Sequence, residues 1–400
     1  MQDIYIGRQP IYDRKLELFA YELLYRANNV RNSAGDINHD HATTQVVLNA
    51  FLEFGLEQLV GQNLAFINLP RSFVVGDMPL PFPKEHVVLE ILEDIKVDDN
   101  FLNAVRQLHG KGYQIALDDF TYHPHLRPLL EASKIVKIDF LALSRAEIQE
   151  HVAALREYDV KLVAEKIETH EDFEFARDLG FHYFQGYFFC RPHIISGRSL
   201  STNRLATLRL LSKLLDPDNQ VAELADLVSQ DIALSYKLLH SLNSSFYALP
   251  QRIESIHHAI VYLGLQQIKQ WVSLIVLTNI PDKPSQLMVT ALTRGKMCEL
   301  IGEALKEKNK ESFFTVGLFS LLDALMDTPM DKVLANLPLA DEIKRALLKW
   351  EGKMGEILRW VLAYEQGRWD EIDFSPSQSK IVTQSYLQAV SWTDQVIQTF

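Results

Sequence analysis

Short apolar runs, each followed by a polar residue, recur through the first half of this 400-residue chain. Runs of this kind are typical of buried parallel strands, and the helical patterns between them indicate repeated βα units. We therefore expect an α/β fold of the TIM-like (β/α) barrel class. The five clearest runs are Ala65–Ile67 before Asn68, Val87–Leu89 before Glu90, Gln114–Leu117 before Asp118 and Asp119, Ile135–Val136 before Lys137, and Leu162–Ala164 before Glu165.

A helical period replaces the strand pattern in the second half of the chain. Leucines recur at three- and four-residue steps from Leu205 to Leu215, and Asp216-Pro217-Asp218 then breaks the predicted helix. We place a boundary near residue 200, so that a barrel domain at 1–197 precedes an all-α helical domain at 198–400. Further helical patterns cover 221–228, 235–242, 256–263, 268–277 and 385–400.

The polar residues that follow the strands indicate a site at one end of the barrel. In a βα barrel, the catalytic groups lie at the carboxyl ends of the strands. One acid there is usually a helix cap or a solvated residue, but asparagine, glutamate and paired aspartates that converge form a site for hard divalent cations. Two cations bridged by carboxylates can activate a water and stabilise the leaving oxygen of a phosphodiester. In such a site Lys137 would orient the water or offset the phosphate charge.

Composition narrows the range of partners and compartments. The chain is 47% hydrophobic, enough for a large core, and its formal net charge of −12 argues against non-specific nucleic-acid binding. Its two cysteines, Cys190 and Cys298, are far apart, which fits reduced thiols rather than a disulfide framework. The N-terminus has no signal-peptide pattern, and no uncharged apolar run is long enough to cross a bilayer. We expect a cytoplasmic protein without a membrane span.

A series of short motifs, in a fixed order, resembles those of EAL domains, which hydrolyse cyclic di-GMP. The likeness spans roughly residues 1–195, and several motifs in the right order make it specific. The first motif differs at its centre, where Leu23 stands in place of alanine. The motifs are Tyr21–Arg26, Phe66–Leu69, Leu89–Glu93, Leu117–Phe120, Lys137–Asp139, Ala164–Thr169 and Gln185–Tyr187.

The resemblance implies a metal-dependent site at the matching positions. Lys137 and Glu168 would support the attacking water, and Glu165 would line the catalytic end of the barrel. The residues that would hold Mg²⁺ or Mn²⁺ are Glu22, Asn68, Glu90, Asp118 and Asp119.

Three further positions would have supporting roles according to the same resemblance. Arg26 would contact a ligand phosphate, because its planar fork suits phosphate oxygens. Gln185 would line the catalytic end, and Glu93 would brace the loop that follows the paired aspartates.

The loop after the paired aspartates departs from the family pattern. Active family members carry a glycine-rich, serine-containing loop there, whereas this chain has Phe120–Leu126 without glycine. Pro124 fixes φ and removes an N–H, so a glycine-dependent conformation is not expected. Lys166 also replaces the glycine that follows Glu165, and its ammonium would either approach the metal site or be solvated. The set of ligands is complete, but the loop that supports them is altered.

Residues 216–265 resemble the HDOD domain, a non-catalytic relative of the HD phosphohydrolases. An HD hydrolase needs a His-Asp pair, but the corresponding segment here is Gly317–Asp323, and no histidine follows His258. We therefore expect a helical interaction module without metal ligands, which binds a protein partner. Asp323 is expected to be a cap or a surface acid. All five tryptophans fall in this half and are expected in its core.

The two halves together resemble the EAL–HDOD proteins of bacterial cyclic di-GMP signalling, which implies control of motility and biofilm formation. The altered loop, Leu23 and Lys166 favour a partly degenerate EAL domain that binds nucleotide or a partner. The alternative is an active Mg²⁺- or Mn²⁺-dependent phosphodiesterase that produces pGpG, which the complete ligand set and Lys137 favour. A nucleotide-independent scaffold is the third hypothesis. Oligomeric state is left open, with a homodimer through the barrel as one outcome.

Overall fold

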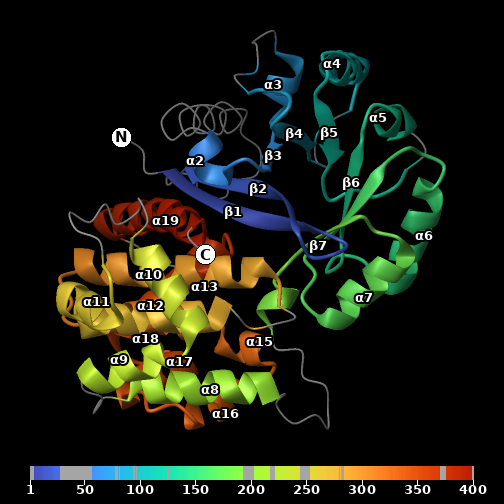
Figure 1. Cartoon of the computed structure of the whole chain (residues 1–400). Coiled ribbons are helices and arrows are strands. Elements are labelled where there is room, and N and C mark those ends of the chain that lie inside the picture. The colour runs from blue at the N-terminus through green and yellow to red at the C-terminus, as the bar shows by residue number, and fades with distance from the viewer. Residues whose placement is uncertain are drawn as a thin grey trace. The chain divides into compact units, whose positions relative to one another are not determined.

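The computed structural model of the chain divides into two compact units (Figure 1). One unit comprises Met1–Phe189 with Glu365–Arg368, and the other comprises Cys190–Tyr364 with Trp369–Phe400. The predicted boundary between residues 197 and 198 lies outside the described residues and stays a prediction. The described residues are 4–27, 56–76, 80, 82–92, 95, 97–123, 126–191, 202–216, 221–243, 253–278, 280, 283–369 and 375–398.

The first unit contains a closed barrel in which the strands follow one another in sequence order, β1 to β8. This arrangement confirms the predicted barrel. Strand β1 runs antiparallel to both of its neighbours, β2 and β8, while all the other neighbours pair in parallel. The strands are β1 (Ile4–Asp13), β2 (Leu18–Ala27), β3 (Leu64–Asn68), β4 (Val87–Ile91), β5 (Gln114–Leu117), β6 (Ile135–Asp139), β7 (Lys161–Glu165) and β8 (Tyr183–Gln185).

A tight turn explains the reversed first strand. The Asp13 carboxylate accepts hydrogen bonds from the backbone N–H groups of Lys15 and Glu17, at 2.8 and 2.9 Å. Leu16 between them has a left-handed φ of 61°. An aspartate that bonds its own backbone a few residues on is a common turn former, so β1 and β2 join as a hairpin rather than through a helix.

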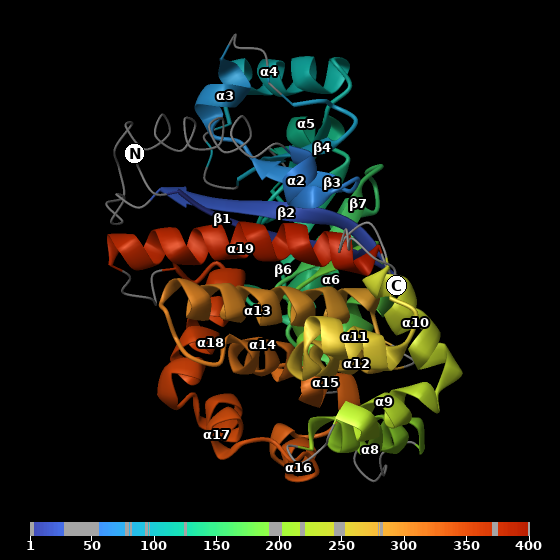
Figure 2. The ribbon, with the colours of Figure 1, turned by 60° about the vertical axis from the view of Figure 1, so that its left-hand side comes forward.

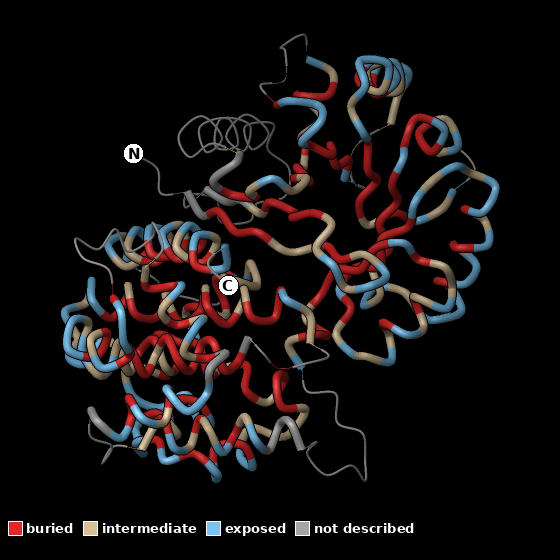
Figure 3. The backbone as a smooth tube through the Cα atoms, in the orientation of Figure 1, coloured by how far each residue is buried: buried red, intermediate tan, exposed pale blue. Residues whose placement is uncertain are grey.

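The centre of the barrel is filled by one side chain from each strand. Side chains of this set alternate with outward-facing ones, as the two-residue period of a strand requires. In Figure 3 the strands are mostly buried, and the outer faces of the surrounding helices are exposed. The core residues are Ile11, Ala20, Phe66, Val88, Ala116, Ile135, Val163 and Tyr183.

Helices follow most of the parallel strands and lie on the outside of the barrel. Helix α4 shows why they form: Asp98 caps its N-terminus by accepting from the Phe101 N–H, and Phe101, Val105 and Leu108 lie on one buried face. These helices are α2 (Leu56–Val60), α3 (Arg71–Val75), α4 (Asp99–Gly110), α5 (Arg127–Glu131), α6 (Arg145–Leu155) and α7 (His170–Leu179), with a 3₁₀ turn, η2 (Phe188–Cys190), after β8.

The described residues of the second unit form helices, as predicted, and more than half of the long helix α13 is buried. It packs against α14 and α19, and α19 lies along it in Figures 1 and 2. The helices are α8 (Thr202–Leu215), α9 (Val221–Ser229), α10 (Ile232–Leu242), α11 (Ile256–Leu263), α12 (Leu265–Thr278), α13 (Ser285–Ala304), α14 (Lys310–Phe319), α15 (Leu322–Met326), α16 (Met330–Ala335), α17 (Asp341–Lys349), α18 (Gly352–Glu365) and α19 (Pro376–Ile397).

Candidate metal and active site

The strand register places the predicted polar residues in one layer at the carboxyl end of the barrel. Seven of them lie two residues after a core residue along the chain, and residues two apart on a strand face the same way. The core layer is therefore covered by a polar layer. The pairs are Ala20 with Glu22, Phe66 with Asn68, Val88 with Glu90, Ala116 with Asp118, Ile135 with Lys137, Val163 with Glu165, and Tyr183 with Gln185.

Lys137 is at the centre of this layer. Its side chain is completely buried, and so is that of Glu90. Four carboxylates from β2, β4, the end of β5 and β7 surround its ammonium. The distances from Lys137 Nζ are 2.6 Å to Glu90 Oε1, 2.7 Å to Glu165 Oε1, 2.8 Å to Asp118 Oδ1 and 3.2 Å to Glu22 Oε2. We call these four acids the carboxylate ring.

The ring holds more negative charge than one ammonium can balance. Burial raises the pKa of Glu90 well above its usual range, and Glu22 raises it further, against the opposing effect of Lys137. Burial likewise raises the pKa of Glu165 well above its usual range. Burial alone would lower the pKa of Lys137, but the carboxylates, Glu165 first, raise it well above its usual value, so this lysine stays charged.

Two amides fix the orientation of Glu22. Gln185 Nε2 donates to Glu22 Oε2 over 2.7 Å, and Asn68 Nδ2 donates to Glu22 Oε1 over 3.4 Å. The Gln185 Oε1 atom is buried and accepts no hydrogen bond from the described residues. A buried acceptor of this kind is usually satisfied by a bound ion, water or ligand.

The acids form two groups that fit divalent cations. Glu22, Glu90 and Asp118 offer oxygens within 4.8 Å of one another, and so do Asp118, Asp119 and Glu165. Asp118 belongs to both groups, as a bridging carboxylate would. Neither carboxylate oxygen of Glu90 has a well-directed hydrogen bond among the described residues, although the charge of Lys137 is close. Hard oxygen donors with unbalanced negative charge are what Mg²⁺ and Mn²⁺ require, so the residues fit these cations.

Comparisons with known proteins match both halves of the chain. A family model described as the EAL domain matches residues 79–192, and one described as the HDOD domain matches residues 202–333. Cyclic di-GMP phosphodiesterase CdgJ of Vibrio cholerae is 35% identical over 377 residues, covering 93% of this chain and 87% of that protein. Uncharacterized protein YuxH of Bacillus subtilis is 34% identical over 400 residues, covering 97% of this chain and 98% of that protein.

This chain belongs to the EAL–HDOD family of bacterial cyclic di-GMP signalling proteins. The resemblance seen in the sequence motifs is therefore confirmed. Among solved structures, the cAMP-bound form of EAL enzyme Bd1971 is 20% identical, with a TM-score of 0.39, and the match covers 46% of this chain and 61% of that one.

Lys166 stands where the EAL motif has glycine, and it keeps a backbone suited to glycine. Its φ is 55°, in the left-handed region that a side chain disfavours. Its ammonium lies 2.5 Å from Asp139 Oδ2 and 3.4 Å from Asp119 Oδ1. The ammonium thus approaches the site, which was one of the two expectations from the sequence. Although burial lowers it, these acids raise the pKa of Lys166 to about 12.

Asp119 is more exposed than the aspartate beside it. Its side chain is 40% exposed, against 10% for Asp118. Its φ of 45° is also left-handed, because the chain turns sharply out of β5 at this point. Burial raises its pKa, and Lys166 opposes that effect. The second group of acids is therefore already paired with a cationic side chain of the protein.

The altered loop of this EAL domain is held at its start. Phe120 is buried, and its N–H donates to the carbonyl of Lys137 over 3.1 Å. His123 is exposed, whereas Pro124 and His125 lie outside the described residues. The loop therefore leaves the ring directly beside the strand that carries Lys137.

Three of the predicted site residues differ in how far the structure describes them. Glu168 follows β7, is half-buried, and is absent from both groups of possible metal ligands. Arg26 lies in β2 opposite Tyr5, but its side chain is outside the described residues. Glu93 lies outside them altogether. Their predicted roles stay predictions.

Sequence reasoning missed two residues of the site. Gln9 pairs with Glu22 and lies two residues before the core residue Ile11, so the antiparallel β1 adds it to the polar layer. Asp139 holds the ammonium of Lys166. Asp139 could have been found from the Lys137–Asp139 motif, but Gln9 could not, because its place depends on the reversed direction of β1.

The HDOD half offers no comparable group of acids or histidines among the described residues. Asp323 is half-buried in the first turn of α15, where its Oδ1 accepts from the Ala324 N–H over 2.8 Å. Burial raises its pKa. Asp323 is therefore neither the N-cap, which is Leu321, nor a surface residue, so the expectation of a cap or surface acid was wrong. No helix in the described part of the chain is long and apolar enough to span a membrane.

Proposed function

We propose that the EAL domain of this protein hydrolyses cyclic di-GMP to linear pGpG with Mg²⁺ or Mn²⁺. The observation that carries this proposal is the carboxylate ring around Lys137. Four buried acids around one ammonium leave a surplus of negative charge, and a protein retains such a surplus where cations bind. The similarity to the phosphodiesterase CdgJ, which covers 93% of this chain and 87% of that protein, supports the same reaction in this chain.

Each residue of the site would have a distinct task. Glu22, Asn68, Glu90, Asp118 and Asp119 would hold the cations, which when bound would supply Lewis acidity and lower the pKa of a water. Lys137, fixed within the ring, would orient the attacking water and offset charge on the phosphate. Glu168 would support the same water, and Arg26 would bind a phosphate oxygen of the substrate.

Binding without turnover is the second candidate, and a specific observation favours it. Lys166 already pairs with Asp119 and Asp139, and it lies where active relatives have glycine. A cation of the protein at this position would compete with a divalent ion. The domain would then bind cyclic di-GMP with an incomplete set of metals and hydrolyse it slowly or not at all.

The deciding experiment follows binding and pGpG formation in one sample of purified full-length protein with cyclic di-GMP and Mn²⁺. We expect turnover that depends on the metal and falls at least about 100-fold in Glu90→Gln, which removes one buried ligand. Binding without turnover would favour the second candidate. Neither binding nor turnover would contradict both and leave the scaffold hypothesis.

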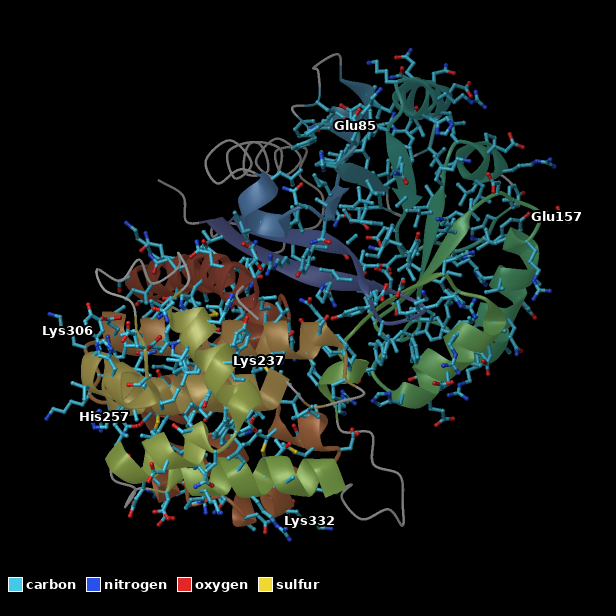
Figure 4. The ribbon with its side chains drawn as sticks, viewed as in Figure 1. Glu85, Glu157, Lys237, His257, Lys306 and Lys332 are labelled. Carbon is cyan, nitrogen blue, oxygen red and sulfur yellow. The ribbon has the colours of Figure 1, made fainter. Side chains whose placement is uncertain are left out.

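Glu85→Gln is the matched control for Glu90→Gln. Glu85 is exposed and lies just before β4, at the opposite end of that strand from Glu90 (Figure 4). The chemical change is the same in both variants, but only one touches the carboxylate ring. Equal losses in the two variants would count against a role for the ring.

The remaining expectations concern partners and output. We propose that the HDOD domain binds a protein partner and that the chain acts in cytoplasmic control of motility and biofilm formation. Family membership supports these roles in general terms. A homodimer through the barrel is a further proposal, which the sedimentation of the purified protein would test.

A further inference from the structure

A polar stripe runs along α12, a helix whose residues from Ile268 onward are mostly buried and apolar. Its members, Gln266, Lys269, Gln270 and Ser273, are three and four residues apart, so they share one face of the helix. Buried apolar residues, including Trp271 and Ile275, occupy the other faces. Lys269 and Ser273 are the buried members of the stripe, and they need partners because unpaired polar groups are costly away from water.

The stripe borders a cavity of about 330 Å³ inside the helical unit. The cavity is open to solvent on one side and lies between α12 and α14, bordered by the end of α8, the segment before α17 and the start of α17. Its volume lies within the usual range for small-molecule pockets, roughly 300–1,000 Å³. Its remaining walls are mainly apolar, with Leu215, Phe314, Leu318, Phe319, Leu339 and Ile343 among them.

Lys269 brings a positive charge to this cavity. Its side chain is only 6% exposed, and its ammonium donates to the backbone carbonyl of Asp216 over 2.7 Å. An ammonium has three donors, and this bond occupies one of them. Burial lowers the pKa of Lys269, and the charge of Asp216 opposes that effect. The bond to Asp216 helps to end α8, but it leaves donors for a second acceptor.

Ser273 is the second, independent sign of a ligand. It lies one turn beyond Lys269, and its Oγ is buried without a hydrogen-bond partner among the described residues. A hydroxyl with a purely structural role would be hydrogen-bonded within the protein, since buried polar groups almost always are. Lys269 and Ser273 together therefore offer a cation and a hydroxyl on one face of the cavity.

Glu311 limits the charge that the cavity would accept. It lines the cavity from the first turn of α14, and its backbone carbonyl accepts from Gln270 Nε2 over 3.4 Å. A negative side chain at the lining disfavours a doubly charged ligand but leaves room for a single charge at Lys269. The apolar walls require that the rest of the ligand be hydrocarbon.

We propose that the helical domain binds a small monocarboxylate with an apolar body. The carboxylate would accept hydrogen bonds from the Lys269 ammonium and the Ser273 hydroxyl. The hydrocarbon part would lie among Phe314, Leu318 and Ile343. This domain would then be a small-molecule receptor, independent of the chemistry in the barrel.

Calorimetric titration of the full-length protein with octanoate tests the proposal. Octanol is the neutral control, and octyl phosphate is the doubly charged one. We expect saturable binding of one octanoate per chain, and weaker or no binding of the other two. Ser273→Ala should weaken octanoate about fivefold, the value of one hydrogen bond, and Lys269→Met at least about tenfold.

Lys332→Met is the matched control for Lys269→Met, because Lys332 is exposed on α16 (Figure 4). It should leave the octanoate titration unchanged. If Lys269→Met fails to fold, Ser273→Ala carries the test, because that hydroxyl makes no bond to the described residues that its loss would break. Three outcomes would overturn the proposal: no saturable octanoate binding, equal binding of octanol, or unchanged binding in both cavity variants.

Discussion

At the scale of single residues, the site is defined by how charge is shared among buried groups. Lys137 is held by four acids and keeps its charge in spite of complete burial. Lys166 is held by two acids that are more exposed, and it has a strained backbone. The first lysine is part of the expected machinery, whereas the second stands where the EAL motif has glycine and is proposed to compete with a cation for Asp119. We therefore expect substitutions of the two lysines to have different effects.

Replacing Lys166 by glycine should open the second group of acids to a cation. The change removes the ammonium beside Asp119 and relieves a left-handed backbone that costs about 1–2 kcal/mol with a side chain. Loss of the half-exposed ion pairs costs roughly 0.2–1 kcal/mol each, so the stability should change little. We expect Mn²⁺ to bind roughly tenfold more tightly, equivalent to about 1.4 kcal/mol, in a calorimetric titration without nucleotide.

Lys166→Ala separates the charge from the backbone in this test. This variant also removes the ammonium, so Mn²⁺ should bind more tightly than in the unchanged protein. It keeps a side chain at positive φ, so it should be less stable than Lys166→Gly. If neither variant changes the Mn²⁺ titration, the ammonium does not compete with the metal.

At the scale of elements, each unit contains a place where two backbone segments approach so closely that only glycine fits between them. Gly186, directly after β8, has a φ of 147°, and a Cβ there would lie 2.1 Å from the carbonyl oxygen of Ile167. The strand that carries Gln185 can therefore lie against the segment after β7 only because residue 186 is glycine. In the helical unit, α13 and α14 approach in the same way at Gly295 and Gly317.

Gly317→Ala should destabilise the helical unit. A Cβ at this position would lie 2.4 Å from the backbone carbonyl oxygen of Arg294. The nearest atoms are all backbone atoms of α13, which have little room to move. Overpacking of this kind costs typically about 1–3 kcal/mol. We expect a lower midpoint for the unfolding of the helical unit, followed by circular dichroism during heating.

The control for this prediction is Gly110→Ala at the end of α4. A Cβ there meets nothing within 4 Å, and alanine is the better helix former by roughly 0.5–1 kcal/mol. This variant should be neutral or slightly more stable. An equal loss of stability in the two variants would show that the close helix approach is not the cause.

At the scale of the whole molecule, two units with separate cores carry two different kinds of chemistry. The barrel gathers acids at one end, and the helical unit has an open cavity whose walls are partly apolar and include the buried ammonium of Lys269. We expect the two units to unfold in separate transitions, and a ligand of one unit should then stabilise that unit first.

Mn²⁺ should therefore raise the unfolding temperature of the barrel and leave that of the helical unit unchanged. At a concentration of about 100 times Kd, a ligand of the native state adds about 2.7 kcal/mol to its stability. Calorimetric scans with Mn²⁺ and with a chelator would measure this difference. Glu22→Gln should abolish the shift, and a shift that persists in this variant would place the metal elsewhere.

Much of the fold followed from local pattern. The apolar runs of β3 to β7 and the helical periods of α8 to α12 were visible because a strand alternates every two residues and a helix every 3.6. The antiparallel β1 was not visible, since its direction depends on a tight turn and on closure of the barrel. Trp350 shows the same limit: it was expected in the core, but it is 41% exposed.

The membership of the site follows from the order of residues along the chain, because each acid, amide or lysine ends a strand and strand ends meet in a barrel. How these residues share charge depends on tertiary packing: Lys137 contacts four acids, Lys166 pairs with Asp119 and Asp139, and α12 turns its polar stripe toward a cavity. The physical reason is that strand and helix periods are local properties of the chain. Distances between charges, and the burial that shifts their pKa values, arise only when segments far apart in sequence pack together.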